Sequence, residues 1–374
     1  MKRNTAFLLL FLTITVSCHS QEVAKKIVVE PDTLRVKLIF AGDMMGHMPV
    51  VNAAYIDSLK TYDYSQFLEY VKPYTTSADL GIVNLEVPLA GPPYSGYPEF
   101  SSPDALIDGL KSVGFSLFIT ANNHSLDRGK QGFERTLMIL DSFKIQHTGT
   151  FRDSAEFRKL NPLIIERNKV RLAFLNYTYG TNGFKVHKPN IENYIDTTQI
   201  RKDILTCRQQ QTDFVIVTFH WGNEYERYPS KEQKAVGEFT RKCGADAIFG
   251  SHPHVIQTID VLHNTKDSTE YFPIVYSVGN FVSNQRDRYR DGGIIFELEL
   301  EKIKTTRVKS FHYMPVWVYK GIIKNRMGYR LIPPFYFDNA VQELKISEAD
   351  QKKCLEFYSD TRSHLSNVPE ALKK

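Results

Sequence analysis

The sequence predicts an α/β sandwich with mixed sheets, and two observations carry that prediction. Apolar, strand-like runs alternate with amphipathic helical stretches from residue 34 to about residue 250, and strands predominate after that point. Alternating strands and helices build a largely parallel sheet with helices on its faces, while consecutive strands add antiparallel edges. The chain has 374 residues, of which 42% are hydrophobic and 24% charged, enough for one large domain or two average ones.

The first residues are typical of a secretion signal. A basic start is followed by the apolar stretch 6–16 and then by Ser17 and Cys18. About ten apolar residues are too short to span a bilayer. The cysteine resembles that of a bacterial lipoprotein signal, so we expect cleavage before Cys18 and lipid on its thiol. A plain secretory signal is the alternative, because Thr15 stands where such signals usually carry leucine.

The lipoprotein-signal interpretation predicts where the protein is located and how its N-terminal residues divide into two segments. Residues 1–17 are the expected signal peptide, and the aperiodic residues 18–33 form a tether between lipid and domain. The protein is then anchored to a membrane through lipid in the bacterial cell envelope, either periplasmic or surface-exposed. Loss of Lys2 and Arg3 with the signal lowers the formal net charge from +5 to +3.

Charge and cysteine usage exclude some classes of function. No Lys/Arg stripe with interleaved aromatic residues is present, which argues against a nucleic-acid partner. Besides Cys18 the chain has Cys207, Cys243 and Cys354, none of them in a C-x-x-C pair. A cysteine zinc site and a thioredoxin-like motif are therefore not supported.

The expected elements follow from local pattern, in chain order. Residues 34–41 alternate and then become continuously apolar, as a strand does on entering a buried sheet, whereas the helical stretches repeat apolar residues three and four apart. Loop 88–103, rich in Gly, Pro, Ser and Tyr, is long enough to be functional. Expected strands are 34–41, 79–87, 116–120, 163–166, 170–177, 213–219, 247–249, 272–278 and 293–301, with 308–319 as an outer strand. Expected helices are 64–73, 103–113, 132–143, 200–211, 231–243 and 347–365. We expect one domain at 34–320 and a C-terminal extension, 321–374, that packs on it.

Polar residues cluster where the expected strands end, and the carboxyl ends of strands are where ligands collect in α/β sheets. Oxygen and nitrogen ligands without thiolate favour manganese, iron or zinc, and a carboxylate can bridge two such ions. We therefore expect one or two divalent metal ions. The residues concerned are Asp43, Glu86, Asn123, His124, His220, His252 and His254, with His47, Asn280 and Glu224 as further candidates for contact with metal or substrate.

Six blocks carry a resemblance to a known family. They are AGDMMGH (41–47), NLE (84–86), ANNHSLDRG (121–129), HWGNEY (220–225), GSHPHV (250–255) and VGNF (278–281). In this order they resemble the metallophosphatase (calcineurin-like phosphoesterase) superfold, an α/β/β/α sandwich. More narrowly, they resemble the capsule biosynthesis, poly-gamma-glutamate synthesis (CapA-like) family, over roughly residues 36–300.

The resemblance implies a role for each ligand. Asp43 and His254 would hold a first ion, and Glu86 would bridge to a second. The second ion would be completed by Asn123, His220 and His252.

Two further roles and one departure follow from the same resemblance. His124 would protonate the leaving group, oriented by Asp127. The superfold usually places a histidine two residues after its first Asp, and Met45 stands there. A thioether is a poor ligand for a hard divalent ion, so the first site is expected to be weak, empty or completed by His47.

Two hypotheses about function remain. The first is a metal-dependent hydrolase of a phosphoester or amide bond, with poly-gamma-glutamate or a related anionic envelope polymer as substrate class by resemblance. Arg128, Arg286 and Arg288 could hold its carboxylates or could equally be solvated loop charges. The second is a polymer-binding or export component that catalyses nothing. Met45 favours the second and His124 the first, since a pure binding protein needs no general acid.

Overall fold

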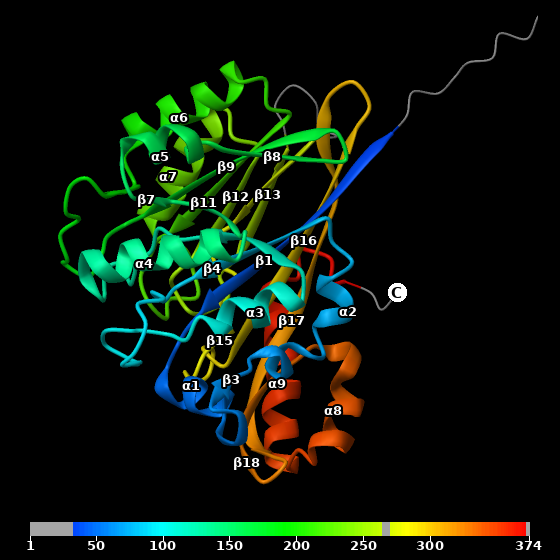
Figure 1. Cartoon of the computed structure of the whole chain (residues 1–374). Coiled ribbons are helices and arrows are strands. Elements are labelled where there is room, and N and C mark those ends of the chain that lie inside the picture. Colours follow the sequence, from blue (N-terminus) through cyan, green and yellow to red (C-terminus); the bar gives the residue numbers. More distant parts are fainter. Residues whose placement is uncertain (1–32, 264–269, 372–374) are drawn as a thin grey trace, which may run out of the picture. The chain divides into compact units, whose positions relative to one another are not determined.

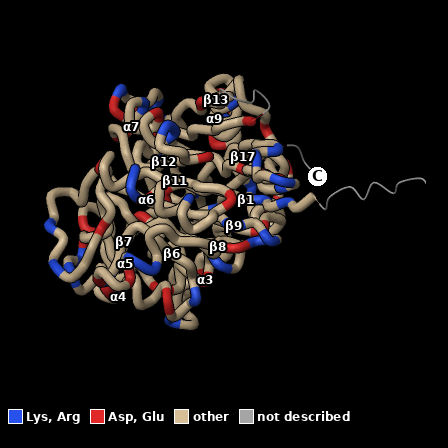
Figure 2. Tube along the Cα trace, turned by 90° about the horizontal axis from the view of Figure 1, so that it is seen from above, with Lys and Arg blue, Asp and Glu red and all other residues tan. Residues whose placement is uncertain are grey.

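The computed structural model describes residues 33–263 and 270–371 (Figure 1). The expected signal peptide, Cys18 and all but the last residue of the expected tether lie outside the described residues. Among the helices that are described, none is long and apolar enough to cross a membrane. Figure 2 shows acidic and basic residues interspersed along the described chain.

The larger sheet has eight strands in the order β18-β17-β16-β1-β4-β5-β6, with β15 paired to the end of β1. Strands β1, β4, β5 and β6 are parallel, whereas β16, β17 and β18 extend the sheet in antiparallel fashion from β1. Their bounds are β1 Leu34–Met44, β4 Leu80–Leu85, β5 Phe115–Ile119, β6 Gln146–Thr148, β15 Asn280–Val282, β16 Gly292–Lys302, β17 Thr306–Ile323 and β18 Arg326–Ile332.

The smaller sheet has six strands in the order β13-β14-β12-β11-β9-β8. Its central strands β9, β11, β12 and β14 are parallel, and β8 and β13 pair antiparallel at the two edges. The bounds are β8 Leu163–Arg167, β9 Val170–Thr178, β11 Phe214–His220, β12 Ala247–Ser251, β13 Ile259–His263 and β14 Tyr271–Val275.

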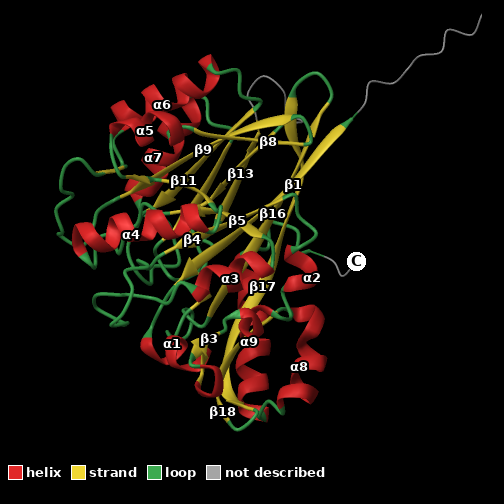
Figure 3. Ribbon diagram, in the orientation of Figure 1, coloured by secondary structure: helices red, strands yellow, loops and turns green. Residues whose placement is uncertain are grey.

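The two sheets pack face to face, and helices cover their outer faces (Figure 3). Between the sheets, the Phe40 ring on β1 stacks on Phe249 of β12 with centroids 3.5 Å apart. Apolar residues of α3 pack on the outer face of the larger sheet, and those of α6 and α7 on the smaller one. The main helices are α3 Ala105–Ser112, α4 Gly129–Ser142, α6 Thr197–Gln209, α7 Lys231–Lys242, α8 Phe337–Leu344 and α9 Glu348–His364. The predicted α/β/β/α sandwich with mixed sheets is confirmed.

Two local predictions are wrong. The stretch 308–319 is not an outer strand, because β17 pairs with β16 on one side and with β18 on the other. The expected single helix at 64–73 is instead a 3₁₀ turn, Ser65–Leu68, followed by the short helix α2, Lys72–Thr75. Pro73 lies in the first turn of α2, where its missing N–H costs nothing.

The remaining elements are short. They are α1 Met48–Ala54, α5 Ser154–Leu160, β2 Tyr55–Ile56, β3 Thr61–Tyr62, β7 Thr150–Phe151, β10 Ile191–Glu192 and two further 3₁₀ turns, Asp57–Leu59 and Pro334–Tyr336. At the C-terminal end, β18 is a strand of the larger sheet and α9 contacts β17. The boundary expected at 320/321 falls inside β17.

Candidate metal centre

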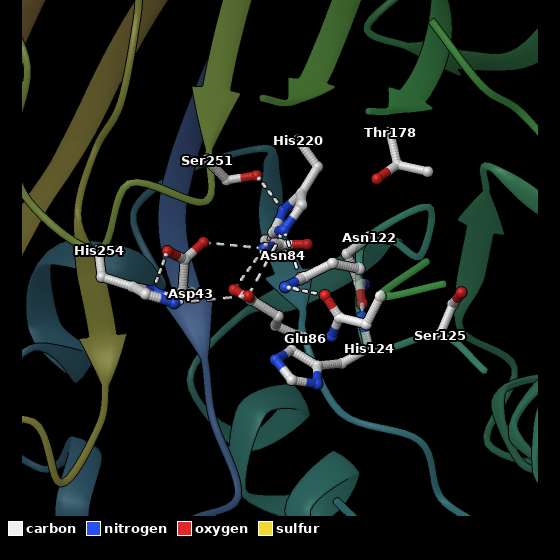
Figure 4. A network of polar contacts seen from close by, with 12 residues as sticks. Asp43, Asn84, Glu86, Asn122, His124, Ser125, Thr178, His220, Ser251 and His254 are labelled. Atoms are coloured by element: carbon white, nitrogen blue, oxygen red, sulfur yellow. Dashed lines mark hydrogen bonds and ion pairs between the residues drawn. The ribbon is translucent and has the colours of Figure 1, made fainter. Parts of the chain in front are cut away.

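Strand ends from both sheets meet at one buried place (Figure 4). Asp43 is the penultimate residue of β1 and Glu86 directly follows β4, both in the larger sheet. His220 is the last residue of β11, and His252 follows β12, both in the smaller sheet. All four side chains are at most 3% exposed. The centre therefore depends on the packing of the two sheets.

Close backbone approach and strained turns shape these strand ends. A Cβ on Gly42 would overlap the carbonyl oxygen of Gly279, and one on Gly250 would overlap that of Tyr276. Beyond Gly250 the chain makes its turn with positive φ at His252 (99°) and His254 (58°). Non-glycine residues in such conformations cost about 1–3 kcal/mol each and are held by their surroundings, often at functional sites.

Glu86 lies at the middle of the centre. Its Oε1 is 3.4 Å from His220 Nε2 and 3.7 Å from His254 Nε2, yet it accepts no hydrogen bond. Ligands that share an ion at about 2.0–2.2 Å lie about this far apart. Glu86 also belongs to two of the groups of side chains compact enough to hold an ion, one with His252 and His254 and one with Asp43 and His220.

Asp43 is tied to its neighbours by hydrogen bonds. His254 Nδ1 lies 2.9 Å from Asp43 Oδ2, and the Asn84 amide donates to Asp43 Oδ1 at 2.8 Å and to Glu86 Oε2 at 3.2 Å. Burial alone would raise the pKa of Asp43, but these bonds outweigh it and hold the pKa below the ordinary value. Since an ionised Asp43 only accepts, His254 Nδ1 must be the donor to it, which leaves Nε2 as the ring nitrogen that could bind an ion.

The imidazoles and Glu86 have opposite pKa shifts. Burial, with repulsion from neighbouring histidines, lowers the pKa of His220 well below its ordinary value and that of His252 to about 3. Both rings are therefore neutral at neutral pH and can act as ligands. Burial, and then the charge of Asp43, raises the pKa of Glu86 well above its ordinary value. A divalent cation would offset the cost of holding two buried carboxylates together, so the donor set fits a metal ion.

The residues expected for the second ion are also brought together. Asn123 Oδ1 lies 2.8 Å from His220 Nε2, and the rings of His220 and His252 have centroids 4.7 Å apart. His252 Nδ1 is buried without a hydrogen-bond partner. The two compact groups that contain Glu86 pair His252 with His254 and His220 with Asp43, whereas the expected first ion pairs Asp43 with His254 and the second pairs His220 with His252. The division of the ligands between two ions therefore stays a prediction.

His124 is held in a fixed orientation beside the centre. Its Nδ1 lies 2.8 Å from Asp127 Oδ2, which also accepts from the Phe100 backbone N–H at 2.8 Å. The Phe100 ring packs edge-on against His124 with centroids 4.7 Å apart. Burial raises the pKa of Asp127, although its bond with His124 opposes this. Because the contact with Asp127 uses Nδ1, Nε2 of His124 is left available for proton transfer.

The three further candidates differ in position. The Asn284 backbone N–H donates to His47 Nδ1 at 3.4 Å, so a neutral His47 carries its proton on Nε2 and offers a donor rather than a ligand there. Asn280 begins β15, donates to the His254 carbonyl at 3.2 Å, and leaves its own buried Oδ1 without a partner. Glu224 is exposed. Its charge still contributes to the raised pKa of Glu86.

Sequence reasoning missed two residues of the centre. Asn84 bridges both carboxylates, and its signal was its place two residues before Glu86, which puts both on one face of the strand. Tyr179, which follows β9, is 47% exposed and lies over His252 with ring centroids 4.6 Å apart. Met45 is buried among the apolar residues on the outer side of the larger sheet.

Comparison with known proteins matches this chain to the family model described as bacterial capsule synthesis protein PGA_cap, over residues 37–285. The capsule biosynthesis protein CapA of Bacillus anthracis is 26% identical over 250 residues, which cover 63% of this chain and 58% of that protein. The PGA biosynthesis protein CapA of Bacillus subtilis (strain 168) is 28% identical over 262 residues, 68% and 65% of the two chains. The matched region is thus less than two thirds of either relative.

Among solved structures, NAD nucleotidase of Haemophilus influenzae aligns with a TM-score of 0.49 and 12% identity, covering 89% of this chain and 68% of that one. The fold described above rests on the strand order and packing of this chain itself.

Proposed function

Because the chain belongs to the bacterial capsule synthesis protein PGA_cap family, we propose that it is a metal-dependent hydrolase of the cell envelope. Its substrate is an anionic capsule polymer such as poly-gamma-glutamate. The substrate class rests on the names of the two Bacillus relatives, a capsule and a PGA biosynthesis protein. The location is the cell envelope, with a lipid anchor at Cys18.

One observation supports the metal-dependent part of this proposal. Glu86 Oε1 is a buried oxygen without a hydrogen-bond partner that faces Nε2 of both His220 and His254. Buried polar groups without partners are uncommon and costly. A divalent ion held by Asp43, Glu86, Asn123 and the histidines would polarise the scissile bond and activate water.

The other steps belong to side chains of this chain. Asp127 fixes the ring of His124 through Nδ1, so that Nε2 can carry a proton toward the leaving group. Asn84 keeps the two carboxylates aligned by donating to both. The half-exposed ring of Tyr179 packs against the buried ring of His252.

A second candidate function is a polymer-binding or export component without turnover. Met45 favours it, because the thioether replaces an imidazole expected at the first ion and is buried among apolar side chains. The oriented pair His124–Asp127 favours the hydrolase, since binding alone needs no positioned acid.

The metal content of the full chain, purified without chelator or histidine tag, tests the proposal. We expect one or two manganese, iron or zinc ions per chain, and a lower content in His252→Ala. His124→Ala should keep the metal and lose release of glutamate from a γ-linked polymer. His187→Ala, at an exposed histidine, is the control and should change neither. A chain that takes up no metal even after soaking would refute the hydrolase, and loss of metal in His124→Ala would refute the division of roles.

A further inference from the structure

Two cations without carboxylate partners are linked, through the loop that follows β15, to His47 beside the metal centre. They are Arg286, on the loop between β15 and β16, and Lys320, near the end of β17. Among the described residues, neither forms an ion pair with an acid. The neighbouring arginines of the same loop are already neutralised: Arg288 pairs with Asp291 and Asp360, and Arg290 pairs with Asp287.

The loop that carries Arg286 leaves the centre directly. It follows β15, whose first residue, Asn280, is in register with Asp43 of β1. Asn284 on this loop accepts from Lys320 Nζ at 2.9 Å and donates its backbone N–H to His47 Nδ1. A chain of contacts therefore joins Lys320 to His47.

An aromatic ring contacts each cation, one from β17 and one from β18, two strands that pair with each other. The Arg286 guanidinium lies over the Trp317 ring at 5.8 Å, and Lys320 Nζ lies 5.8 Å from the centre of the Tyr329 ring. The charge of Arg286 also opposes the rise in the pKa of Tyr329 that burial causes, so both cations act on that ring. Stacked or cation–π contacts position a guanidinium without neutralising it.

Of the two cations, Arg286 has the less satisfied hydrogen-bond donors. Its Nη1 is buried and donates no hydrogen bond. The acids whose charges reach it are Asp291 and Asp350, and Asp291 is already bound by Arg288 and by the Trp317 indole N–H at 3.0 Å. A partly buried cation with an unused donor is stabilised by an incoming oxyanion.

We propose that Arg286 and Lys320 form a subsite for a carboxylate of the substrate chain, on the His47 side of the metal centre. This inference rests on the proposed function, because a polymer with regularly spaced carboxylates could place one group at the metal and another at the subsite. Arg286 Nη1 has no hydrogen-bond partner of its own, and Asn284 of the same loop contacts both Lys320 and His47. A planar guanidinium matches a carboxylate in shape, and the Lys320 ammonium adds charge.

Calorimetric titration of the metal-loaded full chain with a γ-linked glutamate decamer tests the subsite. Arg286→Gln and Lys320→Gln should each weaken binding about tenfold, which corresponds to about 1.4 kcal/mol, with metal content and melting midpoint unchanged. Arg286→Lys keeps the charge and should lose less. Lys304→Gln, an equal change of charge at the exposed β16–β17 turn, is the matched control and should bind as the wild type does.

Each contrary outcome points to a different error. If both Gln variants bind the decamer as tightly as the wild type, the carboxylates are held elsewhere and only the subsite is refuted. A wild type that binds metal but not the decamer likewise overturns the subsite and leaves the metal centre standing. If the variants lose affinity for inorganic phosphate but not for the decamer, the ligand is a phosphate. Loss of metal in Lys320→Gln would show that these cations support the metal ligands instead.

Discussion

Replacement of Glu86 by Gln should have opposite effects on the metal-free and the metal-loaded protein. In the metal-free protein Glu86 Oε1 is buried without a partner next to Asp43. An unsatisfied buried group of this kind costs about 1–3 kcal/mol, and more when charged. Glu86→Gln should therefore raise the melting midpoint of the metal-free protein.

The size of both effects follows from the length of the folded unit, Thr33–Lys374. About 340 residues at about 2.1 cal/mol/K each give an unfolding entropy of about 0.7 kcal/mol/K, so 1 kcal/mol shifts the midpoint by about 1.5 °C. The variant should then melt about 2–4 °C higher without metal. Metal at a thousand times its Kd stabilises the wild type by about 4.1 kcal/mol, or about 6 °C. The variant should lose most of that gain, because Glu86 serves both ligand groups.

Differential scanning calorimetry of the full chain, with and without chelator, measures all four midpoints. Glu226→Gln, at an exposed residue of the loop after β11, removes the same charge and should behave as the wild type does. A Glu86→Gln protein that melts lower than the wild type without metal, and still gains about 6 °C with it, would contradict the placement of Glu86 between the ligands.

Two further predictions concern proton release and backbone packing. Because the pKa of Glu86 is raised, metal binding must displace its proton, so the metal affinity measured by competition with a chelator should fall about tenfold per pH unit below that raised pKa. The buried His252, with a pKa of about 3, adds nothing to this pH dependence above pH 5. Glu86→Gln should abolish the pH dependence. Gly250→Ala should lower both the thermal midpoint, by several degrees, and the metal content, because the added Cβ would overlap the Tyr276 carbonyl. Gly180→Ala is the control and should change neither, because the space around its Cβ is open. Equal behaviour of the two variants would contradict the tight packing at Gly250.

The fold and the set of polar strand ends could be predicted because both are local in the sequence. A buried strand is a short apolar run, and its last residues are next to it in the chain, so Asp43 and His220 were found from their places after such runs. The family resemblance, which the match over residues 37–285 confirms, rested on the order in which the six polar sequence blocks follow one another.

The rest depends on contacts between distant segments, which local pattern does not contain. The interior position of β17 comes from its pairing with the edge strand β18. The seven residues of β18, Arg326–Ile332, carry two exposed side chains at their start and show no strict alternation. Pro73 suggested the end of a helix, although the first turn of a helix accepts proline equally well. The bridging role of Asn84 appears only once β1 and β4 lie side by side. The roles assigned to the individual ligands stay predictions.

The origin of the candidate ligands in two sheets has a consequence for folding. Asp43, Glu86 and Asn123 offer oxygen atoms and come from the larger sheet, whereas His220, His252 and His254 offer nitrogen atoms and come from the smaller one. A chain in which only one sheet has formed presents a single kind of donor and an incomplete shell. Binding of an ion by this full set of ligands would therefore require that the two sheets have already packed together, so metal content would report on complete assembly of the sandwich.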